Sequence, residues 1–447
     1  MNGPDALSKL ASTIETQRAQ AGPLKVGGKI THASSMELRI EGISRLVRIG
    51  DTVALQNSLN DSLGEVIAID GTCATVAPYE IGLGIGLSHI CWVRGPATIY
   101  PSATWKGRVI DALAQPIDNR GPIIPGSTSL ATTTAPPSPL ERQRVERALK
   151  TNVKVIDLFT PLCAGQRIGI FAGSGVGKST LLGMLARSRG FDTTIVALVG
   201  ERGREVREFI DDILGPAIQN SIVVVSTSDQ SPMMRRQAPR TAMTIAEYFR
   251  DRGENVLLIV DSITRYAHAL REVALAAGEP PVARGYTPSV FSELPQLLER
   301  SGPGTHGHGM ITGVFSVLVD GDDHNEPVAD AVRGILDGHI VLSREIATRG
   351  QFPAVDILNS ISRLSEKAWS TEEKALALQA KRMIAEYENT RELRMLGAYK
   401  PGLNRNLDAA IEIVPRIYAY LIQSSTLTVE TSPYQDLSAI LANNNTK

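Results

Sequence analysis

A glycine-rich octapeptide, Ala172–Ser179 (AGSGVGKS), joins an apolar run to a segment with helical character. The run Arg167–Phe171 predicts a buried strand, and the leucines and Met184 that follow Lys178 predict a helix beginning near that lysine. Consecutive backbone N–H groups in such a turn form an anion-binding nest, to which the positive end of the helix dipole adds. The sequence therefore predicts a phosphate-binding loop between a strand and a helix.

The residues of this loop have definite expected roles. Lys178 is expected to contact the β- and γ-phosphates of a nucleotide, and the Ser179 hydroxyl to ligate Mg²⁺. Ala172 stands where the strict motif has glycine, which is tolerated if that residue stays in the β region. The predicted nucleotide contacts are Gly173, Ser174, Gly175, Val176, Gly177, Lys178, Ser179 and Thr180.

Four more apolar runs follow this strand, with helical segments between them. Alternation of such strands with helices predicts a mostly parallel sheet covered on both faces. A Pro/Thr-rich stretch before them, Ala131–Pro139, is expected to be a loop. The further strands are expected at Thr194–Val199, Ile222–Val225, Val256–Val260 and Ile311–Val319.

The first hundred residues have a different pattern. From Leu24 to Val93 the apolar residues alternate with polar ones, as in Met36, Leu38 and Ile40, and short strands punctuated by glycine predict a small β-barrel. The dipeptide Asp70-Gly71 predicts a hairpin whose turn residues adopt positive φ. In the tail before Leu24, the weak stripe Leu7, Leu10 and Ile14 indicates either a frayed terminus or a docking or membrane-touching helix.

Beyond Ser365 the pattern becomes helical and charged, which predicts a C-terminal helical domain with a disordered end. One apolar face is expected to hold Leu376, Ala380, Met383 and Tyr387, and a second to hold Leu407, Ile411, Val414, Tyr418 and Leu421. The predicted divisions are a tail (1–22), a β-barrel (23–97), an α/β P-loop domain (98–364) and a helical domain (365–447).

Charge and composition narrow the class of protein. Lys and Arg number 46 against 47 Asp and Glu, a balance that disfavours a dedicated nucleic-acid binder. Cys73, Cys91 and Cys163 show no C-x-x-C spacing and are expected to be packing residues in a reducing compartment. No apolar run reaches the roughly 18 residues of a membrane span, and no signal-peptide pattern opens the chain. We therefore expect a soluble cytoplasmic protein.

Two carboxylates are candidates for chemistry near the loop. Asp261 ends the apolar run Val256–Val260 and is expected to hold Mg²⁺, because open α/β sheets bind ligands at the carboxyl ends of their strands. Glu201 follows the strand at Thr194–Val199 and could polarise an attacking water, although the charge pattern of Glu201–Glu208 is most often that of a solvated helix, which the residues alone favour. The histidines in Thr305–Gly309 lack further ligands, which favours a flexible loop over a metal site.

The decapeptide Pro353–Ser362 (PAVDILNSIS) resembles the signature of the rotary-type ATPase α/β superfamily, which includes F-type and V-type subunits and type III export ATPases. Gly200–Arg202 and Asp261–Arg265 fall where catalytic subunits carry a water-polarising glutamate and a metal-site aspartate. Further stretches are similar to the flagellum-specific export ATPases, and the resemblance covers about residues 24–424. These stretches are Ala246–Gly253, Gly278–Pro295, Val319–Asp330 and Ala398–Gly402.

The resemblance implies an ATPase that uses Mg²⁺ and forms a homohexamer with nucleotide between subunits. It assigns water activation to Glu201, an arginine finger to Arg363, and adenine stacking to Phe352. Arg202 and Arg265 fall on positions that line the phosphate pocket. The implied partners are a stator-like regulator at the N-terminal tail, a coiled-coil stalk in the ring, export-gate membrane proteins and chaperone–substrate complexes. The implied location is the cytoplasmic face of the inner-membrane export apparatus.

Several alternatives share this core. A virulence-type III secretion ATPase has most of the same motifs, and a proton-translocating F- or V-type catalytic subunit would normally carry a longer C-terminal region. A non-catalytic subunit would lack the glutamate that is present at position 201. A Rho-type RNA translocase would need aromatic residues on a basic barrel, whereas Leu24–Val93 contains only Tyr79 and Trp92.

Overall fold

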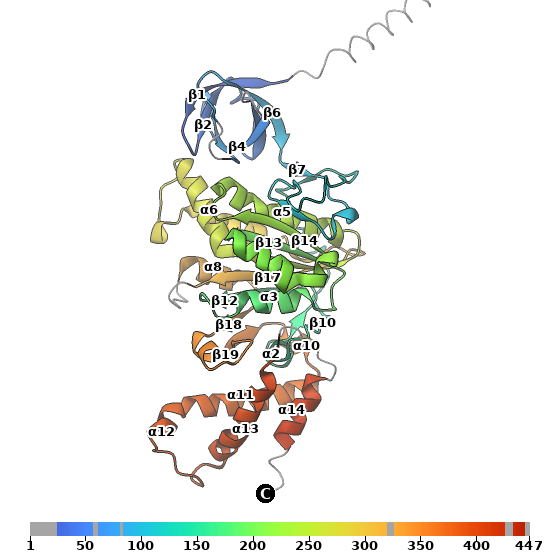
Figure 1. The fold of residues 1–447 in the computed structure, drawn as a ribbon, viewed down its shortest axis with the longest axis vertical. Helices are drawn as coiled ribbons and strands as arrows, with labels where there is room; N and C mark the ends of the chain where they lie inside the picture. The colour runs from blue at the N-terminus through green and yellow to red at the C-terminus, as the bar shows by residue number, and fades with distance from the viewer. Residues whose placement is uncertain (1–24, 57–60, 81–83, 320–325, 425–431, 443–447) are drawn as a thin grey trace, which may run out of the picture. The chain divides into compact units, whose positions relative to one another are not determined.

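The computed structural model describes residues 25–56, 61–80, 84–319, 326–424 and 432–442. The described residues fall into two compact units that meet in sequence between Ala97 and Thr98 (Figure 1). The predicted docking stripe of Leu7, Leu10 and Ile14 lies outside the described residues, and so does the end of the chain after Ala442.

The first unit is a closed six-stranded barrel, which confirms the predicted small β-barrel. Its interior is apolar: Ile30, Ile40, Val53 and Val76 are almost completely buried, as expected for alternate residues of strands that close on themselves. Met36 precedes the strand and is exposed, so it was wrongly included in the alternating pattern. The strands are β1 (Gly27–Ala33), β2 (Leu38–Glu41), β3 (Asp51–Gln56), β4 (Asp61–Ile69), β5 (Cys73–Pro78) and β6 (Ile90–Pro96), in the order β1-β2-β5-β4-β3-β6.

The hairpin between β4 and β5 is present, but its turn differs from the prediction. Gly71 is not in the left-handed region. The carboxylate of Asp70 instead accepts hydrogen bonds from the backbone N–H groups of Thr72 (2.9 Å) and Cys73 (2.7 Å). An aspartate side chain that bonds the backbone ahead of it closes a turn without positive φ.

The second unit is built on a nine-stranded, mostly parallel sheet, which confirms the predicted α/β core. All five strands expected from apolar runs are present, and their residues are almost entirely buried, as in a sheet covered on both faces. The order is β19-β18-β12-β17-β15-β13-β14-β8, with β16 paired to β17 and only β16 and β19 antiparallel. The strands are β8 (Val109–Asp111), β12 (Arg167–Ala172), β13 (Thr193–Glu201), β14 (Ser221–Thr227), β15 (Asn255–Asp261), β16 (Gly302–Pro303), β17 (Met310–Leu318), β18 (Gly338–Leu342) and β19 (Val355–Ser362).

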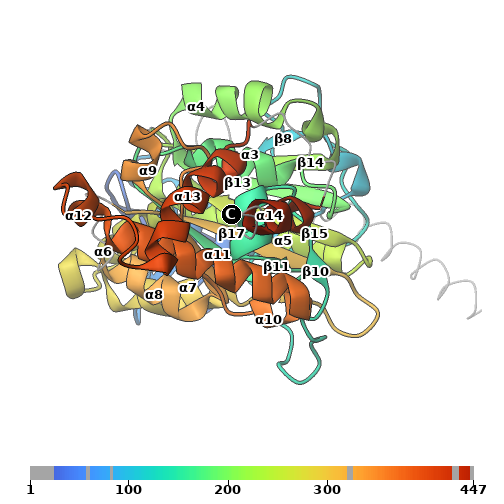
Figure 2. The same ribbon diagram turned by 90° about the horizontal axis from the view of Figure 1, so that it is seen from below.

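Helices cover both faces of this sheet. Figure 2 shows α3 and α4 on one side and α6, α7 and α8 on the other. The helices of the core are α2 (Lys154–Phe159), α3 (Lys178–Ala186), α4 (Gly203–Glu208), α5 (Pro232–Arg250), α6 (Ile263–Ala276), α7 (Pro288–Leu298), α8 (Pro327–Ile335), α9 (Arg344–Thr348) and α10 (Ser365–Ala368); a π-helix spans Phe209–Leu214, and 3₁₀ turns span Ala103–Trp105, Gly215–Asn220 and Ala283–Gly285. Short two-stranded pairs join β7 (Thr98–Ile99) to β9 (Leu130–Ala131) and β10 (Ala148–Leu149) to β11 (Leu162–Cys163).

The Pro/Thr-rich stretch runs as a loop after β9 and is fastened to the core by a buried ion pair. The guanidinium of Arg300 contacts the carboxylate of Glu247 at 2.6 and 2.9 Å, and it also donates to the carbonyl of Thr132 at 2.8 Å. Thr134 donates to the same carboxylate at 3.3 Å. The loop is therefore held by side chains where its prolines prevent regular backbone pairing.

The C-terminal helices pack on the same hydrophobic core as α2 and α3. They are α11 (Thr371–Asn389), α12 (Arg391–Met395), α13 (Arg405–Leu421) and α14 (Pro433–Ala442). Ser370 and Glu373 form a capping box at the start of α11. The buried stripe is Ala377, Ala380, Ile384, Leu407, Ala410, Ile413, Val414, Ile417 and Leu421, so the predicted members Leu376, Met383, Tyr387, Ile411 and Tyr418 lie at its half-buried edges.

Candidate active site

The glycine-rich loop connects β12 to α3 as predicted, and two of its glycines adopt backbone conformations that side chains disfavour. Gly175 has φ 77° and Gly177, which is the N-cap of α3, has φ 90°. Ala172 is still part of β12, so the absence of glycine there is tolerated. The free N–H groups of the first turn of α3 face the loop, which gives it the anion preference of a helix N-terminus.

A cavity of about 530 Å³ opens over this loop, and we call it the P-loop cavity. Its volume falls in the range of small-molecule sites. Val176 does not line it, because its side chain is buried in the core, so this residue can offer only its backbone. The lining residues are Ala172, Gly173, Ser174, Gly175, Gly177, Lys178, Ser179, Thr180, Glu201, Arg202, Glu205, Arg265, Leu318 and Val319.

Lys178 lies between two carboxylates at the carboxyl ends of neighbouring strands. Its Nζ hydrogen-bonds Oδ1 of Asp261, which ends β15, and lies 3.7 Å from Oε1 of Glu201, which ends β13. Asp261 is 3% exposed in its side chain, and its Oδ1 also accepts a 2.6 Å hydrogen bond from the hydroxyl of Ser316. The structure thus brings the predicted lysine, water-activating glutamate and metal-site aspartate into one cluster.

Ser316 is a member of this cluster that the sequence analysis missed. It lies on β17, where Phe315 pairs with Val260, so the next residue along each strand places Ser316 beside Asp261. A polar residue inside the apolar run Ile311–Val319 was the available signal, since a buried hydroxyl needs a hydrogen-bond partner.

Burial raises the pKa of Glu201 to about 7, and the negative charge of Asp261 adds to this effect while Lys178 opposes it. A carboxylate with a pKa near neutrality can accept and release a proton at physiological pH.

The interpretation of Glu201–Glu208 as a solvated helix holds for its later residues. Arg204 pairs with Glu208, and Arg207 pairs with Asp211, on an exposed surface. Glu201 differs from them because it still belongs to β13.

Two arginines, Arg265 and Arg202, border the P-loop cavity, and their side chains have different environments. Arg265, on α6, packs its stem against Gly200, where an added Cβ would lie 3.3 Å from the arginine stem and where φ is 68°. Its Nε is buried and has no hydrogen-bond partner among the described residues, as expected of a group that binds an anion. The side chain of Arg202 is 79% exposed and lies 3.6 Å from Glu205. Both can contact phosphate oxygens, but only Arg265 is held in place by packing.

Phe352 lies beside the loop and not in the P-loop cavity. Its ring faces Gly177, where an added Cβ would lie 3.4 Å from the ring. The ring is half exposed and also borders an apolar hollow lined by Val155, Pro353, Tyr418 and Leu421, which α13 helps to form. This surface can accept a flat apolar ring next to the helix N-terminus.

Arg363 is far from the P-loop of its own chain. It follows β19, which runs antiparallel to β18, and Ser362 pairs with Gly338 at the start of β18. The backbone N–H of Asp337, just before β18, donates to the carbonyl of Arg167, the first residue of β12. The P-loop follows the last residue of that strand, about 20 Å away at the usual rise per residue. The structure therefore does not bring Arg363 to the predicted cluster.

The residues of the site fit a nucleoside triphosphate with Mg²⁺. The hydroxyl of Ser179 and the carboxylate of Asp261 are hard oxygen ligands, which suit a magnesium ion that also binds phosphate oxygens. Within the described ranges, no group of three or more His, Cys, Asp or Glu side chains could hold a metal ion, and that includes His306 and His308. The three cysteines are free thiols.

In the parts of the chain that the structure describes, none of the helices combines the length and apolar character that crossing a membrane requires.

Comparison with known proteins gives concordant matches over nearly the whole chain. Residues 152–362 match the model of the ATP synthase alpha/beta family, nucleotide-binding domain, and residues 369–439 match the T3SS EscN ATPase C-terminal domain. A flagellum-specific ATP synthase of Rhizobium meliloti (strain 1021) is 53% identical over 419 residues, covering 94% of this chain and 90% of the relative.

Two solved structures are also similar. The assembled ATPase EscN from the type III secretion system of enteropathogenic E. coli is 39% identical with a TM-score of 0.85, covering 93% of this chain and 100% of the other. The same ATPase in complex with its central stalk EscO has a TM-score of 0.84 at 39% identity, covering 93% and 99%.

Proposed function

Because this chain belongs to the ATP synthase alpha/beta family and is an ATPase of the flagellum-specific, type III export branch, we propose a mechanism and a set of partners for it. Its energy source is ATP hydrolysis, and its task is the delivery of flagellar proteins to the export gate. The observation that carries the proposal is the cluster of Lys178, Glu201 and Asp261 over the P-loop.

The mechanism assigns a task to each part of the cluster. The N–H groups of Gly173–Gly177 and the ammonium of Lys178 bind the β- and γ-phosphates, and Arg265 adds charge to the same oxygens. Ser179 and Asp261 would hold Mg²⁺, which neutralises charge on the phosphates when bound. Glu201, with its pKa near 7, orients the attacking water and accepts its proton.

Arg363 completes the site of a neighbouring subunit in this proposal. Its position at the amino-terminal edge of the sheet keeps it from its own P-loop, while its exposed side chain is open to another chain. A guanidinium there neutralises charge on the γ-phosphoryl group, a contribution of about 10³–10⁵ in rate in related enzymes. The arrangement requires a ring, and we propose a homohexamer with nucleotide between subunits and Phe352 against the adenine.

The partners follow from family membership. We propose a coiled-coil stalk in the ring, as the complex of EscN with its central stalk EscO suggests by analogy. Chaperone–substrate complexes, export-gate membrane proteins and a stator-like regulator at the N-terminal tail complete the set. We expect the protein to work at the cytoplasmic face of the inner-membrane export apparatus. Virulence-type secretion is the second candidate function, because EscN is similar over 93% of the chain.

Complementation tests the proposal. Expression of the wild-type chain in a bacterium that lacks its flagellum-specific ATP synthase should restore motility, and Lys178→Ala should not. The purified chain should hydrolyse ATP only with Mg²⁺ present. Restored virulence secretion without restored motility, in a host that has both systems and lacks the ATPase of each, would favour the second candidate. A purified, folded chain without ATPase activity would contradict the mechanism.

A further inference from the structure

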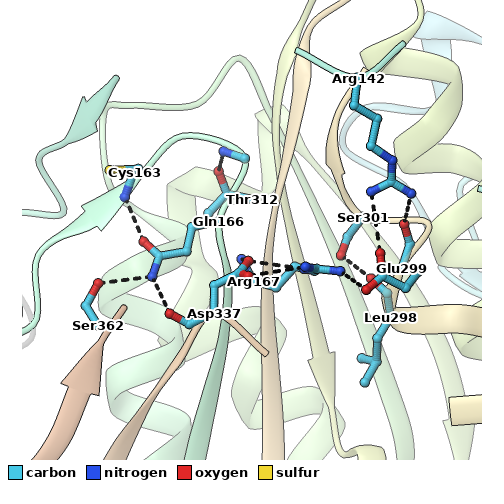
Figure 3. Close-up of polar contacts among 11 residues, drawn as sticks. Arg142, Cys163, Gln166, Arg167, Leu298, Glu299, Ser301, Thr312, Asp337 and Ser362 are labelled. Carbon is cyan, nitrogen blue, oxygen red and sulfur yellow. Dashed lines mark hydrogen bonds and ion pairs between the residues drawn. The ribbon is translucent and has the colours of Figure 1, made fainter. Parts of the chain in front are cut away.

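Asp337, in the turn between α8 and β18, is bonded through both its backbone and its side chain (Figure 3). Its carboxylate accepts hydrogen bonds from the backbone N–H of Arg167 at 3.0 Å and from the guanidinium of Arg167 at 3.1 and 3.2 Å. Its carbonyl oxygen accepts the backbone N–H of Arg363 at 2.9 Å. One residue therefore ties the backbone of Arg363 to the first residue of β12.

A buried amide secures the same turn. Gln166 is completely buried, and its Nε2 donates to the carbonyl of Asp337 at 3.1 Å and to the hydroxyl of Ser362 at 3.0 Å. Its Oε1 accepts the backbone N–H of Cys163 at 2.9 Å. Figure 3 shows this amide between the turn and the end of β19. Ser362, which precedes Arg363, and Asp337, which accepts its backbone N–H, are thus both hydrogen-bonded to buried Gln166.

The side chain of Arg363 has little support of its own. It donates to the carbonyl of Arg333 at 3.3 Å and is otherwise exposed. Its direction therefore depends on where its backbone is held. A group that stabilises a transition state must be placed within a fraction of an ångström, and a displacement of about 1 Å can cost about 10²-fold in rate.

We infer that Asp337 is a positioning residue for Arg363: its bonds to Arg167 and Gln166 hold the backbone from which Arg363 reaches the neighbouring subunit's nucleotide. This inference rests on the proposed function of Arg363. Asp337 touches no nucleotide in this arrangement, and its loss should leave the P-loop of its own subunit intact.

The test uses the matched pair Asp337→Asn and Glu299→Gln. Glu299 is the other carboxylate on Arg167, with its Oε1 2.5 Å from Nη1; among the described residues its side-chain ion pairs are with Arg167 and Arg142, and not with Arg363. Asp337→Asn should lower kcat about 10- to 100-fold and leave the KM for ATP almost unchanged. Glu299→Gln should keep near wild-type kcat. An equal loss in both variants would mean that Arg167 supports only the stability of β12, and would overturn the inference.

Mixed rings separate positioning from general damage. Lys178→Ala subunits keep Arg363, so mixing them with Asp337→Asn subunits should recover part of the ATPase activity. Mixing Asp337→Asn with Arg363→Ala should recover none, because neither subunit offers a well-placed arginine. Recovery in this second mixture, or none in the first, would overturn the inference.

The reference mixture of Arg363→Ala with Lys178→Ala tests the proposed function itself. If it fails to recover in rings shown to co-assemble, the trans role of Arg363 is wrong, and the role of Asp337 is wrong with it. Nucleotide binding and thermal melting of each variant report folding. If Asp337→Asn does not fold, Arg167→Lys, which keeps the charge but loses the two-pronged contact, enters the same mixtures.

Discussion

The ammonium of Lys178 and the carboxylate of Glu201 lie 3.7 Å apart, although 22 residues, which form most of α3 and β13, separate them in the chain. Both lie at the carboxyl edge of the sheet, where α3 starts and β13 ends. In the proposed mechanism, this proximity lets Lys178 and Glu201 act on the same γ-phosphoryl group.

Glu201→Gln should bind Mg-ATP about as well as the wild type and hydrolyse it at least ~100-fold more slowly, because the amide fills the site but cannot accept a proton. Fluorescent-nucleotide binding and phosphate release measure the two steps. Glu208→Gln, which removes an exposed carboxylate of α4, is the control and should keep its activity. Lost binding with intact chemistry would mean that Glu201 is structural.

The pH dependence of stability should change in the same variant. The pKa of Glu201 is raised from 4.5 to about 7, so the folded chain binds more protons than the unfolded one within this window. Its stability contribution is therefore present at low pH and is lost as the pH rises through about 7. Glu201→Gln should be more stable than the wild type at pH 8, by at most about 3 kcal/mol. The difference should vanish near pH 4.5 in urea denaturation; the same difference at both pH values would contradict the raised pKa.

Lys178→Ala should abolish nucleotide binding and turnover, since it removes the charge that compensates the β- and γ-phosphates. The buried carboxylate of Asp261 would also lose its cationic partner, so a loss of thermal stability should accompany the effect. Lys374→Ala, whose ammonium pairs with Glu366 on the surface, is the control. Calorimetric titration with ATP measures binding, and near wild-type hydrolysis would show that the P-loop assignment is wrong.

Arg363→Lys should be nearly as inactive as Arg363→Ala, because a point charge does not reproduce the planar fork of a guanidinium. Both variants should still bind ATP, since the P-loop of each subunit is unchanged. Steady-state kinetics should therefore show a lower kcat with a KM close to the wild-type value. Arg416→Lys, an exposed pair with Glu412, serves as the control. A raised KM with unchanged kcat would place Arg363 in ground-state binding instead.

Phe352→Ala should raise the KM for ATP about 10-fold and leave kcat nearly unchanged, because stacking on a base is worth about 1–3 kcal/mol in ground state and transition state alike. Phe352→Tyr keeps the flat ring against Gly177 and should behave like the wild type. The two variants differ only in the ring, so an equal effect of both on KM would argue against stacking.

Much of this protein could be predicted from local pattern. The loop at Ala172–Ser179 requires glycines with positive φ between a strand and a helix. This requirement can be recognised in the sequence because it falls on residues close together in the chain. The parallel strands, the barrel and the C-terminal helices also follow from periodicity, because burial selects apolar residues at the spacing of each element. Local pattern gave the wrong turn at Asp70-Gly71, because this dipeptide can close a hairpin in two ways. The prediction used a glycine with positive φ, whereas the structure uses hydrogen bonds to the aspartate side chain.

Contacts between strands were decided by the register of the sheet, which no local pattern reveals. Ser316 meets Asp261 only because β17 lies beside β15 with Phe315 opposite Val260. Arg363 lies at the far edge from its own P-loop only because β19 runs antiparallel to β18. The carbonyl of Asp337 likewise accepts the backbone N–H of Arg363, although the two residues are distant in the chain. Hydrogen bonds and charges act through space, so pairings of this kind exist only once the folded core has set the strand order and direction.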